Sequence, residues 1–206
     1  MTKKERAKIV MTELEKIYPE VPIPLNHRNA YELLVAVALS AQTTDKKVNE
    51  VTPKLFSVAP NPEKMAALEE PEIKELIKEI GLSTTKAKNL KLMANQLLER
   101  HNGEVPSNFE DLENLAGVGH KTASVVMSQA FGVPAFPVDT HIHRLMKQWK
   151  LTEGKNVVQT ENDAKKLFPK ETWNKLHLQI IFYGREYSPA RGNQEKDYLT
   201  KMLFEK

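Results

Sequence analysis

Apolar residues recur with the α-helical period in nearly every segment of this chain, and no segment alternates convincingly over the length of a β-strand. This pattern predicts an all-α fold in which short loops join the helices. We expect helices near residues 7–17, 31–40, 44–56, 73–80, 87–101, 109–115, 119–131, 140–149, 157–167, 173–187 and 194–204. Gly81 is expected to end the helix at 73–80, because glycine is favoured just after a helix C-terminus.

Cysteine is absent from all 206 residues. Its absence excludes disulfides, thiolate zinc sites, cysteine nucleophiles and cysteine-ligated iron–sulfur clusters. Any catalytic chemistry must therefore use other side chains, and the length suffices to bury a core without such cross-links.

Charge and hydropathy set weaker limits. The formal net charge of +3 permits an anionic partner without requiring one. The first residues carry mixed charges and lack the apolar core of a secretory signal. The longest apolar run, residues 33–41, is much shorter than the roughly 20 residues that cross a bilayer. We expect a soluble, cytoplasmic protein that does not bind membranes.

Two glycines bracket an apolar residue in the turn Gly117-Val118-Gly119, between two predicted helices. Glycine permits tight turns, and the first backbone amides of the following helix lack intrahelical partners. Together with the positive end of the helix dipole, these amides form a site for a phosphate. The alternative is an ordinary helix–helix turn.

Lys121 lies in the first turn of the helix after these glycines. The positive end of the helix dipole disfavours a cation there and so favours the neutral amine, which is the nucleophilic form. The alternative is a solvated surface lysine.

Asp139 stands at the start of another predicted helix and is expected to cap it. A carboxylate fixed by capping bonds is also suited to stabilise a developing cation or to accept a proton. His141 and His143 follow it, but two residues apart on a helix they do not share a face, so we expect no metal site.

Several motifs together resemble the endonuclease III family of helix-hairpin-helix DNA glycosylases, over nearly the whole chain. The motifs are Leu39–Asp45, Gly81-Leu82, Leu115–Ala123, Phe131-Gly132, Val138–His141 and Gly154–Val157. The resemblance implies two helical lobes with a DNA-binding cleft between them. Residues 22–133 would form one lobe, and residues 1–21 with 134–206 the other.

The same resemblance implies roles for individual residues. Lys121 matches the nucleophile that forms a Schiff base, and Asp139 matches the catalytic carboxylate. The residues implied to contact DNA are Gln42, Asp45, Leu82, Gly117, Val118, Gly119 and His141. Of these, Gln42 and Leu82 would enter the duplex when a base is flipped out, so Leu82 is expected to be exposed.

The chain departs from the family at its C-terminus. Family members usually carry four cysteines there that hold an iron–sulfur cluster, and their spacing falls on Ser188, Glu195, Tyr198 and Phe204. We therefore expect no iron–sulfur cluster and no other cofactor. An apolar stripe is expected to hold the last helix against the helix at 173–187 instead; it comprises Tyr198, Leu199, Met202 and Leu203.

The residues and the resemblance together predict a bifunctional enzyme that excises damaged bases and then cleaves the abasic site by β-elimination. We expect the damaged bases to be oxidised pyrimidines. We expect a monomer that acts on duplex DNA in the cytoplasm, at the nucleoid if the source is prokaryotic. One alternative is a monofunctional glycosylase of the adenine-mismatch kind, which Lys121 and the expected lack of a further domain disfavour. Another is a non-catalytic DNA-binding module, which would need neither Lys121 nor Asp139.

Overall fold

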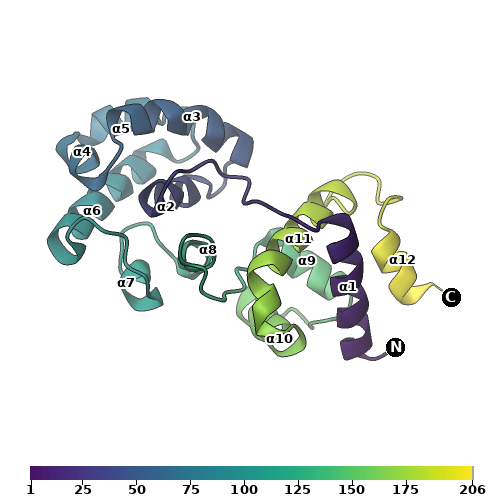
Figure 1. Ribbon diagram of the computed structural model, residues 1–206. Coiled ribbons are helices and arrows are strands. Elements are labelled where there is room, and N and C mark those ends of the chain that lie inside the picture. The colour runs from purple at the N-terminus through teal and green to yellow at the C-terminus, as the bar shows by residue number, and fades with distance from the viewer. Residues whose placement is uncertain (206) are drawn as a thin grey trace. The chain divides into compact units, whose positions relative to one another are not determined.

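A computed structural model describes residues 1–205, and every regular element among them is helical, as the periodicity predicts (Figure 1). The chain forms two compact units. The middle unit is Ile23–Gly132, and the terminal unit joins Met1–Pro22 to the described part of Val133–Lys206. Each unit is described separately below.

The middle unit is built around a long helix, α6, against which α4 and α5 pack, while α2 packs on α8. Its helices are α2 (Ala30–Leu39), α3 (Asp45–Val58), α4 (Pro62–Ala67), α5 (Glu70–Leu76), α6 (Ser83–His101), α7 (Phe109–Glu113) and α8 (His120–Phe131). Helix α2 is buried along almost its whole length because its residues are apolar on all sides apart from Glu32, which is paired with Arg28.

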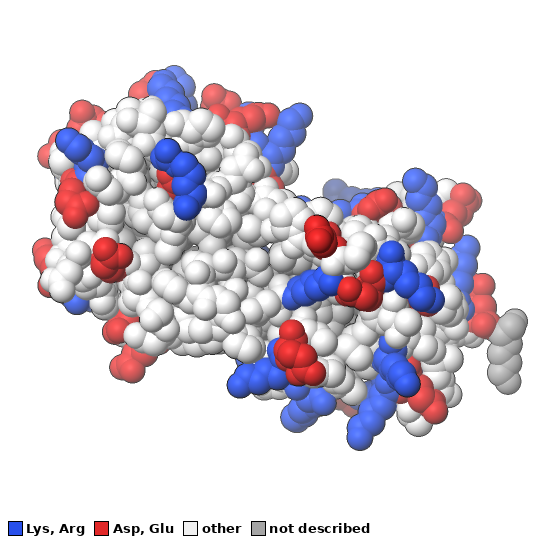
Figure 2. Space-filling view, viewed as in Figure 1, with Lys and Arg blue, Asp and Glu red and all other residues white. Residues whose placement is uncertain are grey.

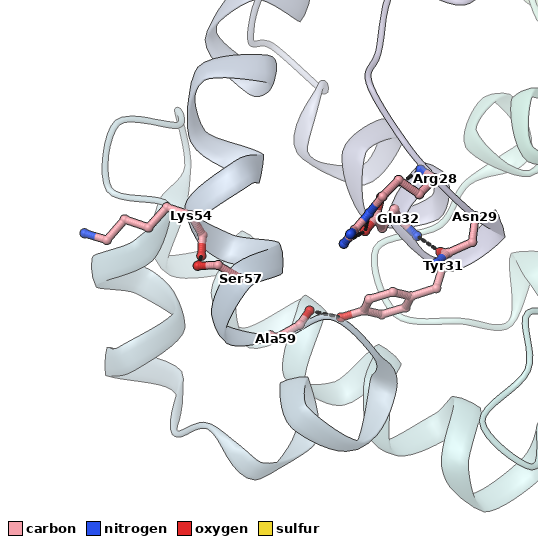
Figure 3. Close-up of polar contacts among 7 residues, drawn as sticks. All are labelled: Arg28, Asn29, Tyr31, Glu32, Lys54, Ser57 and Ala59. Carbon is pink, nitrogen blue, oxygen red and sulfur yellow. Dashed lines mark hydrogen bonds and ion pairs between the residues drawn. The ribbon is translucent and has the colours of Figure 1, made fainter.

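Polar contacts fix the start of α2 (Figure 3). Asn29 caps the helix by accepting a hydrogen bond from the Glu32 amide at 2.9 Å. The buried Glu32 carboxylate accepts from the backbone amide and guanidinium of Arg28, at 2.6–2.8 Å. Tyr31 donates its hydroxyl to the carbonyl of Ala59 at 3.1 Å, which ties α2 to the end of α3. Helix α2 is thus held firmly at one end, and its other end leads into the loop that carries Gln42.

The boundaries in this unit differ from expectation in two places. Helix α4 is not predicted by the apolar pattern, because six residues are too few to show a helical repeat. The helix expected at 73–80 is α5, which ends at Leu76 with Ile77 as its C-cap. The expectation for Gly81 was therefore wrong, since Gly81 instead precedes Leu82, the N-cap residue of α6.

The terminal unit packs α1 against α11 and α12, helices from the opposite end of the chain. Its helices are α1 (Lys3–Ile17), α9 (Thr140–Gln148), α10 (Val157–Leu167), the 3₁₀ turn η1 (Lys170–Thr172), α11 (Trp173–Glu186) and α12 (Tyr198–Phe204). Trp149, Tyr183 and Phe136 are the largest fully buried side chains of its core. Helix α1 adds Ala7, Val10 and Leu14 to that core, as its apolar stripe predicts.

The two units differ in how charged side chains are spread over the face shown in Figure 2. In the view of Figure 2, lysine and arginine alternate with acidic residues over the terminal unit, whereas the middle unit shows a broad area without charged side chains. Among the described residues, no helix combines the length and apolar character that spanning a membrane requires.

Candidate DNA-binding and catalytic site

The glycine turn connects α7 to α8 in the middle unit, and each of its residues has a distinct local role. Gly117 adopts φ +75°, and a Cβ there would lie 3.1 Å from the Cβ of Asn89 on α6. Glycine is therefore required at 117 for both conformation and space. Val118 is buried and donates its amide to the carbonyl of Leu115 at 3.2 Å, which anchors the turn.

Gly119 differs from Gly117. It is the N-cap of α8 with φ −96° and ψ −177°, an extended conformation open to any residue, and no side chain caps the helix. A Cβ at Gly119 would meet nothing within 4 Å. The fold itself thus gives no reason for glycine at 119, whereas a ligand approaching the first turn of α8 would.

Lys121 is exposed in the first turn of α8, directly after this turn. The turn and α8 fix the position of its backbone. Its side chain is left accessible to a ligand bound at the amides of the helix start.

Asp139, in the terminal unit, caps α9 as expected, because its carboxylate accepts a hydrogen bond from the amide of Ile142 at 2.8 Å. The side chain is half-buried. Nearby on α11, burial lowers the pKa of His177 to about 4 against the opposing effect of the Asp139 charge. His177 is therefore neutral at neutral pH and does not compensate the charge of Asp139.

The two histidines of α9 are used in packing and hydrogen bonding within the terminal unit. A Cβ at Gly184 of α11 would lie 3.1 Å from the Cβ of His141, so this glycine allows α9 and α11 to approach closely. His143 contacts the hydroxyl of Thr160 through Nδ1 at 2.8 Å. Within residues 1–205, no group of three or more His, Cys, Asp or Glu is placed to hold a metal ion.

Gln42 and Leu82 lie at the tips of two neighbouring loops of the middle unit. A Cβ added at Gly81 would lie 3.7 Å from the carbonyl oxygen of Gln42, so the two loops run close together. Both residues adopt the left-handed conformation, with φ 56° and 60°, which costs a residue other than glycine about 1–2 kcal/mol. Leu82 is 58% exposed, as expected for a residue that does not serve the core. Asp45, further along the first loop, begins α3 behind the capping residue Thr44.

Lys86, which the sequence pattern does not single out, joins these loops. It lies on the first turns of α6, is 7% exposed, and burial lowers the pKa of its ammonium group. The ammonium donates hydrogen bonds to the carbonyls of Leu39 at 3.0 Å and Ala41 at 2.6 Å, and it contacts the Thr43 hydroxyl at 3.3 Å.

The residues present at the C-terminus do not fit an iron–sulfur cluster. Four thiolates are needed, and Ser188, Glu195, Tyr198 and Phe204 stand at the expected spacing. Ser188 is fully buried, and its hydroxyl and carbonyl oxygens accept hydrogen bonds from Arg144 at 3.4 and 2.5 Å.

Asp197 organises this region instead. Its buried carboxylate accepts hydrogen bonds from the Tyr183 hydroxyl at 2.8 Å, from Gln148 Nε2 at 2.7 Å, and from the amide and hydroxyl of Thr200 at 3.1 and 2.9 Å. Burial raises the pKa of the Tyr183 hydroxyl, and the bond to Asp197 adds to this shift, so the phenol remains a donor. Leu199 donates its amide to the same hydroxyl at 3.1 Å.

Helix α12 differs in part from the expected apolar stripe. Because Asp197 caps it, α12 begins at Tyr198 rather than at residue 194. Leu199 and Leu203 are buried in the terminal core, whereas Met202 is 45% exposed, so its expected place in the packed stripe was wrong. Tyr198 packs edge-on against Tyr183, at 6.2 Å between ring centroids.

A glycine turn between two helices, with an exposed lysine directly behind it, is the arrangement of a helix-hairpin-helix DNA repair protein. The family model "HhH-GPD superfamily base excision DNA repair protein" matches residues 35–170, which include the turn, Lys121 and Asp139.

Comparison with known proteins shows to which family of this class the chain belongs. The endonuclease III of Haemophilus influenzae is 44% identical over 191 residues, covering 93% of this chain and 90% of that protein. A structure of a non-covalent endonuclease III–DNA complex matches with a TM-score of 0.92 at 39% identity, covering 97% of this chain and 95% of the other. A structure of a trapped endonuclease III–DNA covalent intermediate matches with a TM-score of 0.91 at 40% identity, covering 94% and 92%. The chain belongs to the endonuclease III family.

Proposed function

We propose that this protein is a bifunctional DNA glycosylase and abasic-site lyase that removes damaged bases of the oxidised-pyrimidine class from duplex DNA. The observation that carries the proposal is the exposed Lys121 on the first turn of α8. This helix follows the glycine turn and has no side-chain cap at its start. The relative trapped as a covalent intermediate with DNA supports a nucleophile in this family.

In the proposed reaction, the target nucleotide leaves the base stack, which costs a few kcal/mol and is easier at a damaged pair. The neutral Lys121 amine attacks C1′ of the deoxyribose, and the base departs with the electron pair of the glycosidic bond. Opening of the sugar ring converts the C1′ adduct to an iminium, the Schiff base. Loss of a proton from C2′ then expels the 3′ phosphate, and water hydrolyses the remaining imine to free the lysine.

Asp139 is proposed to stabilise the positive charge that develops on the sugar and to assist proton transfer. Its capping bond to the Ile142 amide supports this role, because it fixes the direction of the carboxylate. A carboxylate that also caps a helix can be tested by separating its charge from its hydrogen bond.

Asp139→Asn should retain the cap, because asparagine is an equally good N-cap residue, but lose the charge. We expect single-turnover base excision to slow by about 10²-fold with the thermal midpoint nearly unchanged. Asp139→Ala should slow excision similarly and also lose about 1 kcal/mol of stability. Excision at the wild-type rate in Asp139→Asn would reduce this residue to a helix cap.

The glycine turn is proposed to bind a DNA phosphate with the amides at the start of α8. Gly119→Ala tests this with little disturbance to the fold, because a Cβ there meets nothing and the backbone is extended. We expect affinity for duplex DNA, measured over a range of salt concentrations, to fall by about fivefold to tenfold. The thermal midpoint should fall only slightly, because alanine is a poorer N-cap than glycine but meets no steric obstacle.

Gly117→Ala is the matched variant for that measurement. It should lower thermal stability, because residue 117 has φ +75° and an added Cβ would crowd the side chain of Asn89. DNA affinity in Gly119→Ala equal to that of the wild type at every salt concentration would remove the turn from the binding surface.

Borohydride reduction tests the proposed activity as a whole. The wild-type protein should become cross-linked to a duplex that contains one oxidised pyrimidine, and not to the same duplex without the lesion. Excision without cross-linking or strand cleavage would favour a monofunctional glycosylase. Binding without excision would favour a non-catalytic module. The adenine-mismatch alternative predicts excision of undamaged adenine opposite a lesion, so that duplex serves as a further substrate.

The remaining expectations are proposals as well. The protein acts on duplex DNA with damaged bases or abasic sites, as a monomer, in the cytoplasm at the nucleoid, and without a cofactor. The buried hydrogen bonds of Ser188 and Asp197 support the absence of a cofactor. They lie in the C-terminal segment where the family usually has its cluster cysteines. Light scattering with and without DNA measures the oligomeric state.

A further inference from the structure

Lys86 makes an unusual set of contacts for a lysine, because its buried ammonium donates to two backbone carbonyls and contacts one hydroxyl. The carbonyls of Leu39 and Ala41 lie at the C-terminal end of α2 and just beyond it. A cation is favoured there by the negative end of the helix dipole and by carbonyls without intrahelical partners. The contacts therefore hold the loop that follows α2 against the start of α6.

The loop held in this way carries Gln42, and α6 begins directly after Leu82. Lys86 thus lies close to both exposed tips, because its amide donates to the Leu82 carbonyl at 3.0 Å, and a Cβ added at Gly81 would lie 3.7 Å from the Gln42 carbonyl oxygen. Two adjacent loop tips in the left-handed conformation need support from the surrounding structure. Lys86 supplies that support to both loops at once.

The same helix also supports the glycine turn. Asn89, one turn after Lys86, packs beneath Gly117, and Gln96 accepts a hydrogen bond from the Ala116 amide at 2.7 Å. A small cavity of about 20 Å³ is lined by the end of α2, by α6 and by the glycine turn, with Leu39, Lys86 and Gly117 among its lining residues. Helix α6 is therefore the common support of the two tips and the turn.

We propose that Lys86 is a positioning residue that holds Gln42 and Leu82 in place, so that the protein prefers duplex DNA with an opened base pair over intact duplex. This inference rests on the proposed function, in which the two tips enter the duplex. Lys86 itself touches no DNA, because it is buried beneath the loops.

The preference is measured as the ratio of two dissociation constants. One probe is a duplex with a tetrahydrofuran abasic analogue, which lacks the C1′ hydroxyl and resists the lyase reaction, and the other is the same duplex without it. Lys86→Met retains most of the aliphatic stem and removes the ammonium. We expect it to lower the preference about tenfold, the effect of losing charge-assisted hydrogen bonds, while affinity for intact duplex stays near the wild-type value.

Lys91→Met is the matched control. Lys91 lies on the same helix and also donates to backbone carbonyls, those of Ala66 and Leu68 at the end of α4, where no residue is expected to contact DNA. It should lose stability without losing the preference. Lys88→Met removes an exposed charge from the same helix and controls for electrostatics.

Thr43→Val removes only the hydroxyl contact and should lower the preference by about twofold to threefold, so the test stands even if Lys86→Met does not fold. If Lys86→Met keeps the wild-type preference, the proposed role of Lys86 is wrong, while the proposed function still stands. If only Thr43→Val folds, the same conclusion follows from an unchanged preference in that variant. A wild-type protein that binds both duplexes equally and cross-links to no lesion overturns the proposed function, and this inference with it.

Discussion

Lys121→Gln should bind a lesion-containing duplex nearly as well as the wild type but neither cross-link to it under borohydride nor cleave an abasic site. A carboxamide cannot form an iminium, so cross-linking and cleavage should fall by about 10³-fold or more. Binding should persist, because the backbone amides at the start of α8 and the turn before it remain. Gel-resolved cross-linking and single-turnover cleavage measure both effects.

Lys88→Gln is a suitable control for that variant, since Lys88 is another exposed lysine of the middle unit and its loss changes the net charge equally. It should retain full cross-linking and cleavage. Cross-linking in Lys121→Gln at the wild-type level would show that another amine is the nucleophile, and Lys121 would then be an ordinary surface lysine.

Asp197→Ala should be the most destabilising single change near the C-terminus. It leaves the buried Tyr183 hydroxyl and Gln148 amide without their acceptor and removes the cap of α12. We expect a loss of about 3–5 kcal/mol in the free energy of unfolding and a thermal midpoint lower by about 10 °C. Asp197→Asn, which retains one acceptor oxygen and the cap, should lose about half as much.

Metal analysis of the wild-type protein completes this test. We expect a colourless protein without stoichiometric iron, whose excision activity is unchanged after treatment with a chelator. Stoichiometric iron in the purified protein would contradict the proposal that no cofactor is needed.

An unchanged thermal midpoint in Asp197→Ala would show that the hydrogen-bond network around Asp197 does not hold α12 in place.

The longer helices were predictable because their apolar faces repeat over several turns. Helix α1 buries Ala7, Val10 and Leu14 as its stripe indicates. Helix α4 was not predicted, although the sequence contains a helix start signal at Asn61-Pro62. Asn61 caps this helix by accepting a hydrogen bond from the Lys64 amide at 2.9 Å. So short a helix is stabilised mainly by packing on α6, which a local pattern does not contain.

The candidate site was predictable where local backbone chemistry requires a residue type, as at Gly117 and at the cap formed by Asp139. Lys86 was not predictable, because its acceptors lie more than forty residues earlier in the chain and lysine is usually exposed. The hydrogen-bond network around Asp197 was not predictable from the sequence for the same reason. Tyr183 and Gln148 come from other helices, and only the fold brings them together.

The two units also differ in when they can fold during synthesis. The middle unit is one continuous stretch and is complete once Gly132 has left the ribosome. Helix α1 is made before the middle unit, yet its apolar face packs against α11 and α12, which are made after that unit. Since domains generally fold in the order in which they are made, the middle unit can fold while Val10 and Leu14 of α1 are still exposed to solvent. That interval is when the chain is most exposed to aggregation or to capture by a chaperone.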